Sequence, residues 1–177
     1  DEDTVLIKSA GGGIDVDEAP TRAIVHTRGG NVTIRNADRF VRANTGGGDV
    51  EIELKEGWVA AGTGGGDMVV SIDREGGEKD IILSTGHGDV TLIVPDGYGM
   101  DLDLDLTYTR DSDRDYEIVS DFDIRTERSE DWERRRNWSS WIKHVTCVDE
   151  INGGGQKVRI TTTNGNIAIK RLSLIHI

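Results

Sequence analysis

The chain is poor in cysteine, proline and aromatic residues, and each shortage narrows what it can be. Cys147 is the single cysteine among 177 residues, which excludes an intrachain disulfide. With two prolines and 5% aromatics, the chain relies on its 23 glycines to form turns. No apolar run approaches the roughly 20 residues of a transmembrane helix, so we expect no direct membrane insertion in this segment.

Basic residues are also scarce, because 21 of them face 33 acidic residues and the formal net charge is −12. Nucleic acid binding depends on Lys and Arg side chains that neutralise phosphates, and anionic lipid surfaces attract the same side chains. The charge balance therefore argues against nucleic acid and anionic membranes as partners. It favours solubility.

A short polar turn recurs along the chain. Its six copies begin at Ser9, Thr27, Thr45, Thr63, Thr85 and Thr162. The first four copies follow one another at a constant step of 18 residues, the fifth comes after 22, and the sixth follows a long interruption. A fixed period near 20 residues is typical of a solenoid, in which each repeat forms one coil of a stack.

Apolar residues alternate with polar or small ones on both sides of every turn, which predicts strands with one buried face. Val32, Val50 and Met68 occupy the same position in successive copies. We therefore predict an all-β, single-domain parallel β-solenoid (β-helix) with coils of about 18 residues and one insertion. In this fold, Val32, Val50 and Met68 lie directly above one another around a dry centre.

The turns themselves have a uniform chemistry. The third residue after each Ser or Thr is Gly, as at Gly48, and the next is Gly, Asn or Asp, as at Asp49. Glycine and Asx residues tolerate left-handed backbone conformations, and Asx side chains bond to nearby backbone. Stacked turns are expected to form ladders of Thr hydroxyls and Asx side chains along one edge.

The period breaks between Pro95 and Gly155, and we place an insertion within about 107–150. Alternating residues predict further strands at 100–106, 116–124 and 145–151. A charged, Trp-rich stretch between them supplies the candidate partner-binding residues, since Trp and Arg are frequent binding hot spots. These candidates are Trp132, Arg134, Arg135, Arg136, Trp138 and Trp141. The alternative is that the tryptophans pack on the stack as a cap.

No residue set predicts catalysis, a cofactor or a bound metal. The glycine-rich turns lack the Lys-Ser/Thr of a phosphate loop. His26, His87 and His144 lack the spacing of zinc ligands. Cys147 lies in an expected strand, where a buried thiol is inert. We therefore expect a protein without enzymatic activity, cofactor or metal site.

Two other functions stay open. Outward carboxylates of Glu51, Glu53, Asp101 and Asp103 are candidates for the acidic pair of a polysaccharide-active β-helix enzyme. The Gly46–Asp49 turn is similar to a calcium-binding solenoid repeat, which would make the chain a calcium-stabilised secreted repeat module. The match is incomplete, because no repeat holds two such turns and only three of the six copies carry Asp there.

Four segments carry a family resemblance. They are the repeated Thr-x-x-Gly-Asp-Val-x-Ile, the stretch from Val94 to Leu104, the Ser120–Phe122 segment and the stretch from Ile151 to Ile167. In this order they resemble the bacterial "adhesin" domain family, whose function is unknown. The resemblance covers nearly all of 1–171 except the Trp-rich stretch. It implies a β-solenoid fold and an exported or cell-envelope location, and it implies no catalytic residues.

Together these features predict a non-enzymatic, adhesion-like binding or structural module at the bacterial cell envelope. A cytoplasmic location stays open. The expected partner is a protein or glycan of the envelope, and the end coils leave homo-oligomers possible. We assign 1–171 to the β-solenoid domain. The tail 172–177 continues no repeat and matches the translation of a transposon end used in sequencing libraries, so we expect it to be non-native.

Overall fold

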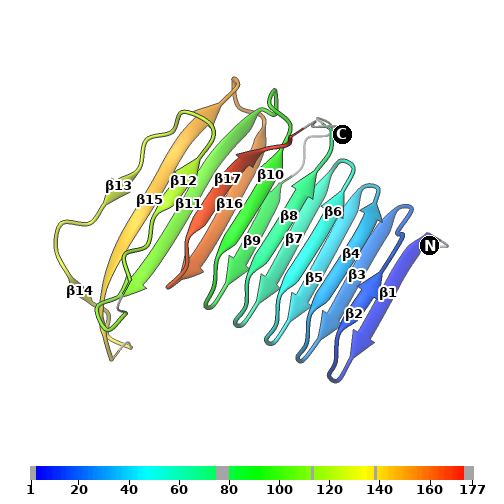
Figure 1. Ribbon diagram of the computed structural model, residues 1–177, viewed down its shortest axis with the longest axis horizontal. Helices are drawn as coiled ribbons and strands as arrows, with labels where there is room; N and C mark the ends of the chain where they lie inside the picture. The colour runs from blue at the N-terminus through cyan, green and yellow to red at the C-terminus, as the bar shows by residue number, and fades with distance from the viewer. Residues whose placement is uncertain (1–2, 75–79, 113, 138, 174–177) are drawn as a thin grey trace.

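The computed structural model describes residues 3–74, 80–112, 114–137 and 139–173. Within these ranges the chain forms strands and turns and no helix, which confirms the all-β prediction. The strands make two sheets that lie as two layers, with the shared core between them (Figure 1). No helix in the described part of the chain is long and apolar enough to cross a membrane.

The strands divide between the two sheets. The larger sheet holds, in spatial order, β1 (Thr4–Ser9), β3 (Arg22–Thr27), β5 (Phe40–Thr45), β7 (Trp58–Thr63), β9 (Ile81–Thr85), β16 (Gln156–Thr163), β11 (Met100–Thr109), β15 (Trp141–Ile151) and β13 (Glu127–Arg128), with β14 (Glu133–Arg134) also on β15. The smaller sheet holds β12 (Ile118–Ser120), β17 (Ile167–Arg171), β10 (Val90–Val94), β8 (Met68–Ile72), β6 (Val50–Leu54), β4 (Val32–Ala37) and β2 (Ile14–Val16).

From β1 to β10 the chain changes sheet at every turn. Each repeat places the strand before its Gly-rich turn in the larger sheet and the strand after it in the smaller sheet. Because side chains alternate between the two faces of a strand, every second residue enters the space between the layers. The buried residues of both sheets accordingly form one hydrophobic cluster.

Equivalent residues of successive repeats pair in parallel and in register. Val32 pairs with Val50, and Val50 pairs with Met68. All three side chains are buried, which confirms the predicted vertical alignment. Small side chains align in the same way, since Ala43 pairs with Ala61 in the larger sheet and both are buried.

The turns form the two predicted ladders. The Thr45 hydroxyl donates to the carbonyl oxygen of Gly30 at 2.8 Å, and the Thr63 hydroxyl donates to that of Gly48 at 2.8 Å. One residue beyond each glycine, an Asx side chain accepts a hydrogen bond from the next turn. The Asp49 carboxylate accepts the backbone N–H of Asp67 at 2.8 Å. Buried Thr and exposed Asx side chains thus join each turn to its neighbour.

The sixth repeat stacks directly on the fifth, although the interruption separates them in sequence. In the larger sheet β16 pairs with β9, and in the smaller sheet β17 pairs with β10, both in parallel. The strands of the interruption lie on the far side of this repeat, because β11 pairs with β16 and β12 pairs with β17. The last repeat therefore lies between segments that precede it in the chain.

The far end of the stack changes to antiparallel pairing. β15 runs antiparallel to β11, and the short strands β13 and β14 run antiparallel to β15 (Figure 1). The 116–124 prediction shortens to β12, while the strands expected at 100–106 and 145–151 extend into β11 and β15. Antiparallel strands cover the last parallel edge of the larger sheet, as the end of a stack requires.

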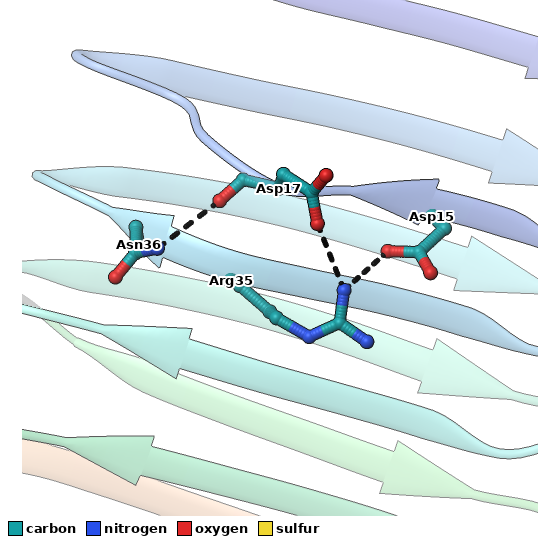
Figure 2. Close-up of polar contacts among 4 residues, drawn as sticks. All are labelled: Asp15, Asp17, Arg35 and Asn36. Atoms are coloured by element: carbon teal, nitrogen blue, oxygen red, sulfur yellow. Dashed lines mark hydrogen bonds and ion pairs between the residues drawn. The ribbon is translucent and has the colours of Figure 1, made fainter.

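Polar side chains connect β4 to β2 in the smaller sheet and to the residues that follow β2. Arg35 in β4 donates from one guanidinium nitrogen to Asp15 at 2.8 Å and to Asp17 at 2.9 Å (Figure 2). The pKa of Arg35 is raised, chiefly by the charge of Asp15 and then by the hydrogen bond to Asp17. Asn36, whose φ is +51°, donates from its amide to the Asp17 carbonyl oxygen.

An aromatic pair marks the start of two neighbouring strands of the larger sheet. Phe40 and Trp58 pair in register, and their rings stack with centroids 4.3 Å apart and planes 10° apart. The Arg22 guanidinium lies over the other side of the Phe40 ring, 5.6 Å from its centroid. Equivalent aromatic side chains of neighbouring strands thus stack on the outer face of the larger sheet, as equivalent apolar side chains do on its inner face.

Candidate functional site

The predicted partner-binding residues separate into a packed group and an exposed group. Trp132 is half-buried and packs against the core, with its ring edge-on to Tyr108 at a centroid distance of 5.6 Å. Lys143 places its ammonium 5.1 Å from the Trp132 centroid, a distance suited to a cation–π interaction. The geometry of Trp132 is that of a side chain packed on the stack as a cap, which was the alternative to partner binding.

The exposed group lies on the outermost strands. Trp141 opens β15 with 44% of its surface exposed, and it pairs across the antiparallel ladder with Arg134 of β14. Arg135 and Arg136 follow β14 in the chain and are exposed. Trp138 lies outside the described residues. The structure thus brings Trp141 and Arg134 side by side at the closing end of the larger sheet.

A cluster that the sequence analysis missed lies around Tyr108, near the end of β11. Arg128 donates to the Tyr108 hydroxyl oxygen and to the Tyr116 carbonyl oxygen, both at 2.8 Å. The Tyr108 ring is buried, and the Tyr116 ring lies tilted against it at 6.2 Å. Within a chain so poor in aromatics, the concentration of Tyr and Trp between 108 and 141 was the available signal.

This cluster borders a hollow of about 340 Å³. The lining includes Tyr108, Trp132 and Lys143, together with the loop that follows β11. Arg110 and Arg114 add two guanidinium groups, and the residues Ser112 and Asp115 complete the lining. A rigid aromatic wall with several cations beside it can bind an anion and an apolar ring face together.

A second hollow, of about 460 Å³, lies on the outer face of the larger sheet. Asp80, Asp101 and Asp103 line it together with Lys157 and Arg159. Arg159 forms an ion pair with the Asp103 carboxylate, with both contacts at 3.2 Å. This hollow therefore brings acidic side chains together, but one of them is already neutralised.

The four outward carboxylates considered for an enzyme do not meet on one face. Glu51 and Glu53 lie on β6 in the smaller sheet, whereas Asp101 and Asp103 lie on β11 in the larger sheet. The candidates therefore form two separate pairs, because β6 and β11 belong to opposite layers. Only Asp101 and Asp103 share a hollow.

The Cys147 thiol is part of the core. Its side chain is 1% exposed on β15, and burial, followed by the nearby Asp149 charge, raises its pKa to about 11. A thiol with such a pKa is almost wholly protonated at neutral pH, and a protonated thiol is a poor nucleophile. The geometry around Cys147 supports a role for its side chain in core packing and no other role.

His144 takes part in a polar contact on the same strand. Its Nδ1 lies 2.9 Å from an Asp105 carboxylate oxygen and 3.2 Å from the Thr107 hydroxyl oxygen. His26 and His87 lie on β3 and in the fifth turn, away from this contact. Among the described residues, no group of three or more His, Cys, Asp or Glu side chains is arranged to hold a metal ion.

The Asx ladder directs its carboxylates to the backbone. The Asp67 carboxylate accepts the N–H of Asp89 at 2.8 Å, and the Asp89 carboxylate accepts that of Asn166 at 2.8 Å. One oxygen of each carboxylate is thereby committed to joining turns. The structural role of these Asp side chains is to satisfy donors of the neighbouring repeat.

Comparison with protein families, with curated proteins and with solved structures found no match to this chain.

Proposed function

We propose that the chain is a β-solenoid that serves as a non-enzymatic binding or structural module at the bacterial cell envelope. Support for the solenoid comes from the parallel, in-register pairing of repeats and from the Thr and Asx ladders between turns. Such a stack is rigid, and it holds side chains of distant segments at fixed spacings. The envelope location follows from the family resemblance.

The binding surface in this proposal is the antiparallel end of the stack. The observation that carries it is the gathering of Trp132, Lys143 and Tyr108 around one hollow, with Trp141 and Arg134 exposed nearby. Partly exposed Trp beside Arg and Lys is the composition of binding hot spots in proteins and of stacking surfaces for sugars. The partner is an envelope protein or glycan.

The opposite end of the stack offers a route to self-association. β1 and β2 each pair with one neighbour, β3 and β4 respectively, so the described chain ends there in parallel edges. Leu6 on β1 is 60% exposed. Unpaired edges accept further strands, and homo-oligomers through this end are therefore part of the proposal.

A polysaccharide-active enzyme is the second candidate, because Asp80 and Asp101 line the same outer hollow. A pair of carboxylates flanking a scissile bond is the requirement for glycoside hydrolysis. Incubation with envelope polysaccharides would then release reducing ends, and Asp101→Asn would abolish the release. We expect no release from the unmodified chain, and a measurable turnover would replace the binding proposal.

The test of the binding proposal is direct binding of the purified chain to immobilised envelope polysaccharides and envelope proteins. A variant with Arg134, Arg135 and Arg136 all changed to Ser and a Trp141→Ser variant are compared with Arg28→Ser, an exposed arginine in a remote turn. We expect the first two to bind at least about tenfold more weakly and the control to bind normally. Equal binding by all three variants, or no binding by the original chain, contradicts the proposal.

A further inference from the structure

The hollow beside Tyr108 has a fixed aromatic wall. Tyr108 is 5% exposed, and Arg128 holds its hydroxyl oxygen while also holding the Tyr116 backbone. Tyr116 in turn accepts a hydrogen bond at its hydroxyl from Ser112 at 3.0 Å. Trp132 packs edge-on against Tyr108. Since each ring is held by a neighbour, little ordering is required when a ligand arrives, and pre-organised sites bind more tightly.

The open side of the same hollow is positively charged. Lys143, Arg110 and Arg114 line it, against one carboxylate from Asp115. Among the residues that the structure describes, no carboxylate lies within ion-pair distance of these three cations. Among the lining residues, three cations against one carboxylate make an excess of positive charge next to aromatic rings. Such an excess attracts an anion.

The hollow also limits the size of that anion. Its volume of about 340 Å³ lies at the small end of the usual range for small-molecule sites, roughly 300–1,000 Å³. The Asp115 carboxylate can accept hydrogen bonds from hydroxyl groups, as a sugar requires.

We propose that this hollow binds an acidic sugar, namely a uronic acid unit of an acidic polysaccharide. The sugar carboxylate pairs with the Lys143 ammonium, and Arg110 and Arg114 contribute positive charge. The C–H face of the pyranose packs on the Trp132 ring, and the ring hydroxyls donate to Asp115. This assignment rests on the proposed binding function and names the class of glycan that the antiparallel end recognises.

The experiment is calorimetric titration of the full chain with glucuronate and galacturonate oligosaccharides. The matched ligands are the neutral glucose and galactose oligosaccharides and glucose 6-phosphate. We expect the uronates to bind at least about tenfold more tightly than the neutral sugars, as expected for one charge-assisted hydrogen bond. Equal affinity for neutral sugars, or tighter binding of glucose 6-phosphate, overturns the assignment to a uronate.

Variants at Lys143 separate the site from general charge attraction. We expect Lys143→Met to weaken uronate binding about tenfold and Lys143→Arg to retain most of it. Lys170→Met is the matched control, because Lys170 is exposed on β17 in the smaller sheet and should leave affinity unchanged. Thermal melting of each variant establishes folding. Equal loss with Lys143→Met and Lys170→Met contradicts the site.

The outcome also separates this inference from the binding function. If the chain binds an envelope protein or a neutral glycan but no uronate, the ligand assignment fails and the binding function stands. If the chain binds none of the envelope components, both fail. A Trp132→Leu variant that folds normally and binds uronates with unchanged affinity removes the stacking role of Trp132 and overturns the proposed pose.

Discussion

The Thr162 hydroxyl donates a hydrogen bond to the Gly88 carbonyl oxygen at 2.7 Å, across 74 positions of the chain. In the earlier repeats the equivalent bond joins near neighbours, as from Thr63 to Gly48 across 15 positions. At the sixth repeat, the same contact between a Thr hydroxyl and a Gly carbonyl oxygen is therefore made by a segment that is distant in sequence. The C-terminal repeat occupies the next place in the stack, and the interruption is displaced to its far side.

Removal of the C-terminal repeat should therefore damage strands that precede it. A chain ending at Gly155 lacks β16 and β17, so β11 loses its parallel partner and stays paired only with β15, which carries the two-residue strands β13 and β14. A small antiparallel group that is detached from the rest of the sheet is marginal in water. We expect amide exchange to show lost protection across β11 and retained protection in β6. Full protection of β11 in the shortened chain would mean that β11 pairs directly with β9.

Gly48 should tolerate no side chain. Its φ is +127°, and an added Cβ would lie 2.5 Å from the Gly30 carbonyl oxygen in the turn below. We expect Gly48→Val to lower the free energy of unfolding by about 2–4 kcal/mol, from backbone strain and the steric clash together. Glu51→Gln, an exposed change nearby, should stay within about 0.5 kcal/mol. Urea denaturation measures both, and equal losses would contradict this role of the turn.

The Asx ladder should depend on the acceptor oxygen and not on charge. Asp67→Ala removes the acceptor for the Asp89 N–H, and we expect a loss of about 1 kcal/mol in unfolding free energy. Asp67→Asn keeps an acceptor and removes one charge from the row that contains Asp49 and Asp89. Its stability should equal or exceed that of the original chain at low salt. Equal destabilisation by both substitutions would mean that the carboxylate charge is required.

The Cys147 thiol should be unreactive until the chain unfolds. Its folded pKa is raised from 9.0 to about 11, so burial favours the protonated form. This contribution to stability is complete below pH 9, and it is lost as the pH rises toward about 11. Ellman's reagent should label the thiol in denaturant and not in the folded chain. Cys147→Val should abolish this part of the alkaline destabilisation, and an unchanged alkaline profile would contradict the assignment.

Asp149 should make the segment before β13 sensitive to acid. Its carboxylate accepts the backbone N–H groups of Arg125 and Glu150, both at 2.9 Å, and these bonds lower its pKa below 3.8. The stabilisation is present above about pH 4, and it is lost as the pH falls through the lower, folded value. The protection of the Arg125 amide, measured relative to its intrinsic exchange rate at each pH, should fall in acid. In Asp149→Ala the exchange of this amide should already be fast at neutral pH, and slow exchange there would contradict the contact.

The repeats show how much of the fold a local sequence pattern predicts. The alternation around Val32, Val50 and Met68 predicts which face of each strand is buried, and the constant step predicts which residues align. Gly48 and Asp49 predict the turn and its ladders from their backbone preferences. The Trp-rich stretch has no repeat, so the sequence left two roles for Trp132. Its contact with Tyr108 comes from pairing of β11 with β15 and from the path of the loop between them.

The sequence by itself determined the strands of the repeats, their buried faces, the turn ladders and the in-register alignment of the first five repeats. Each of these follows from interactions within a repeat or between repeats adjacent in the chain. Only the tertiary structure decided that β16 and β17 lie between β9–β10 and β11–β12, and that Lys143, Trp132 and Tyr108 meet. The open edges of β9 and β10 offer similar backbone groups to any following strand, so local preference does not choose among them. The choice is made by long-range side-chain packing, which no local period encodes.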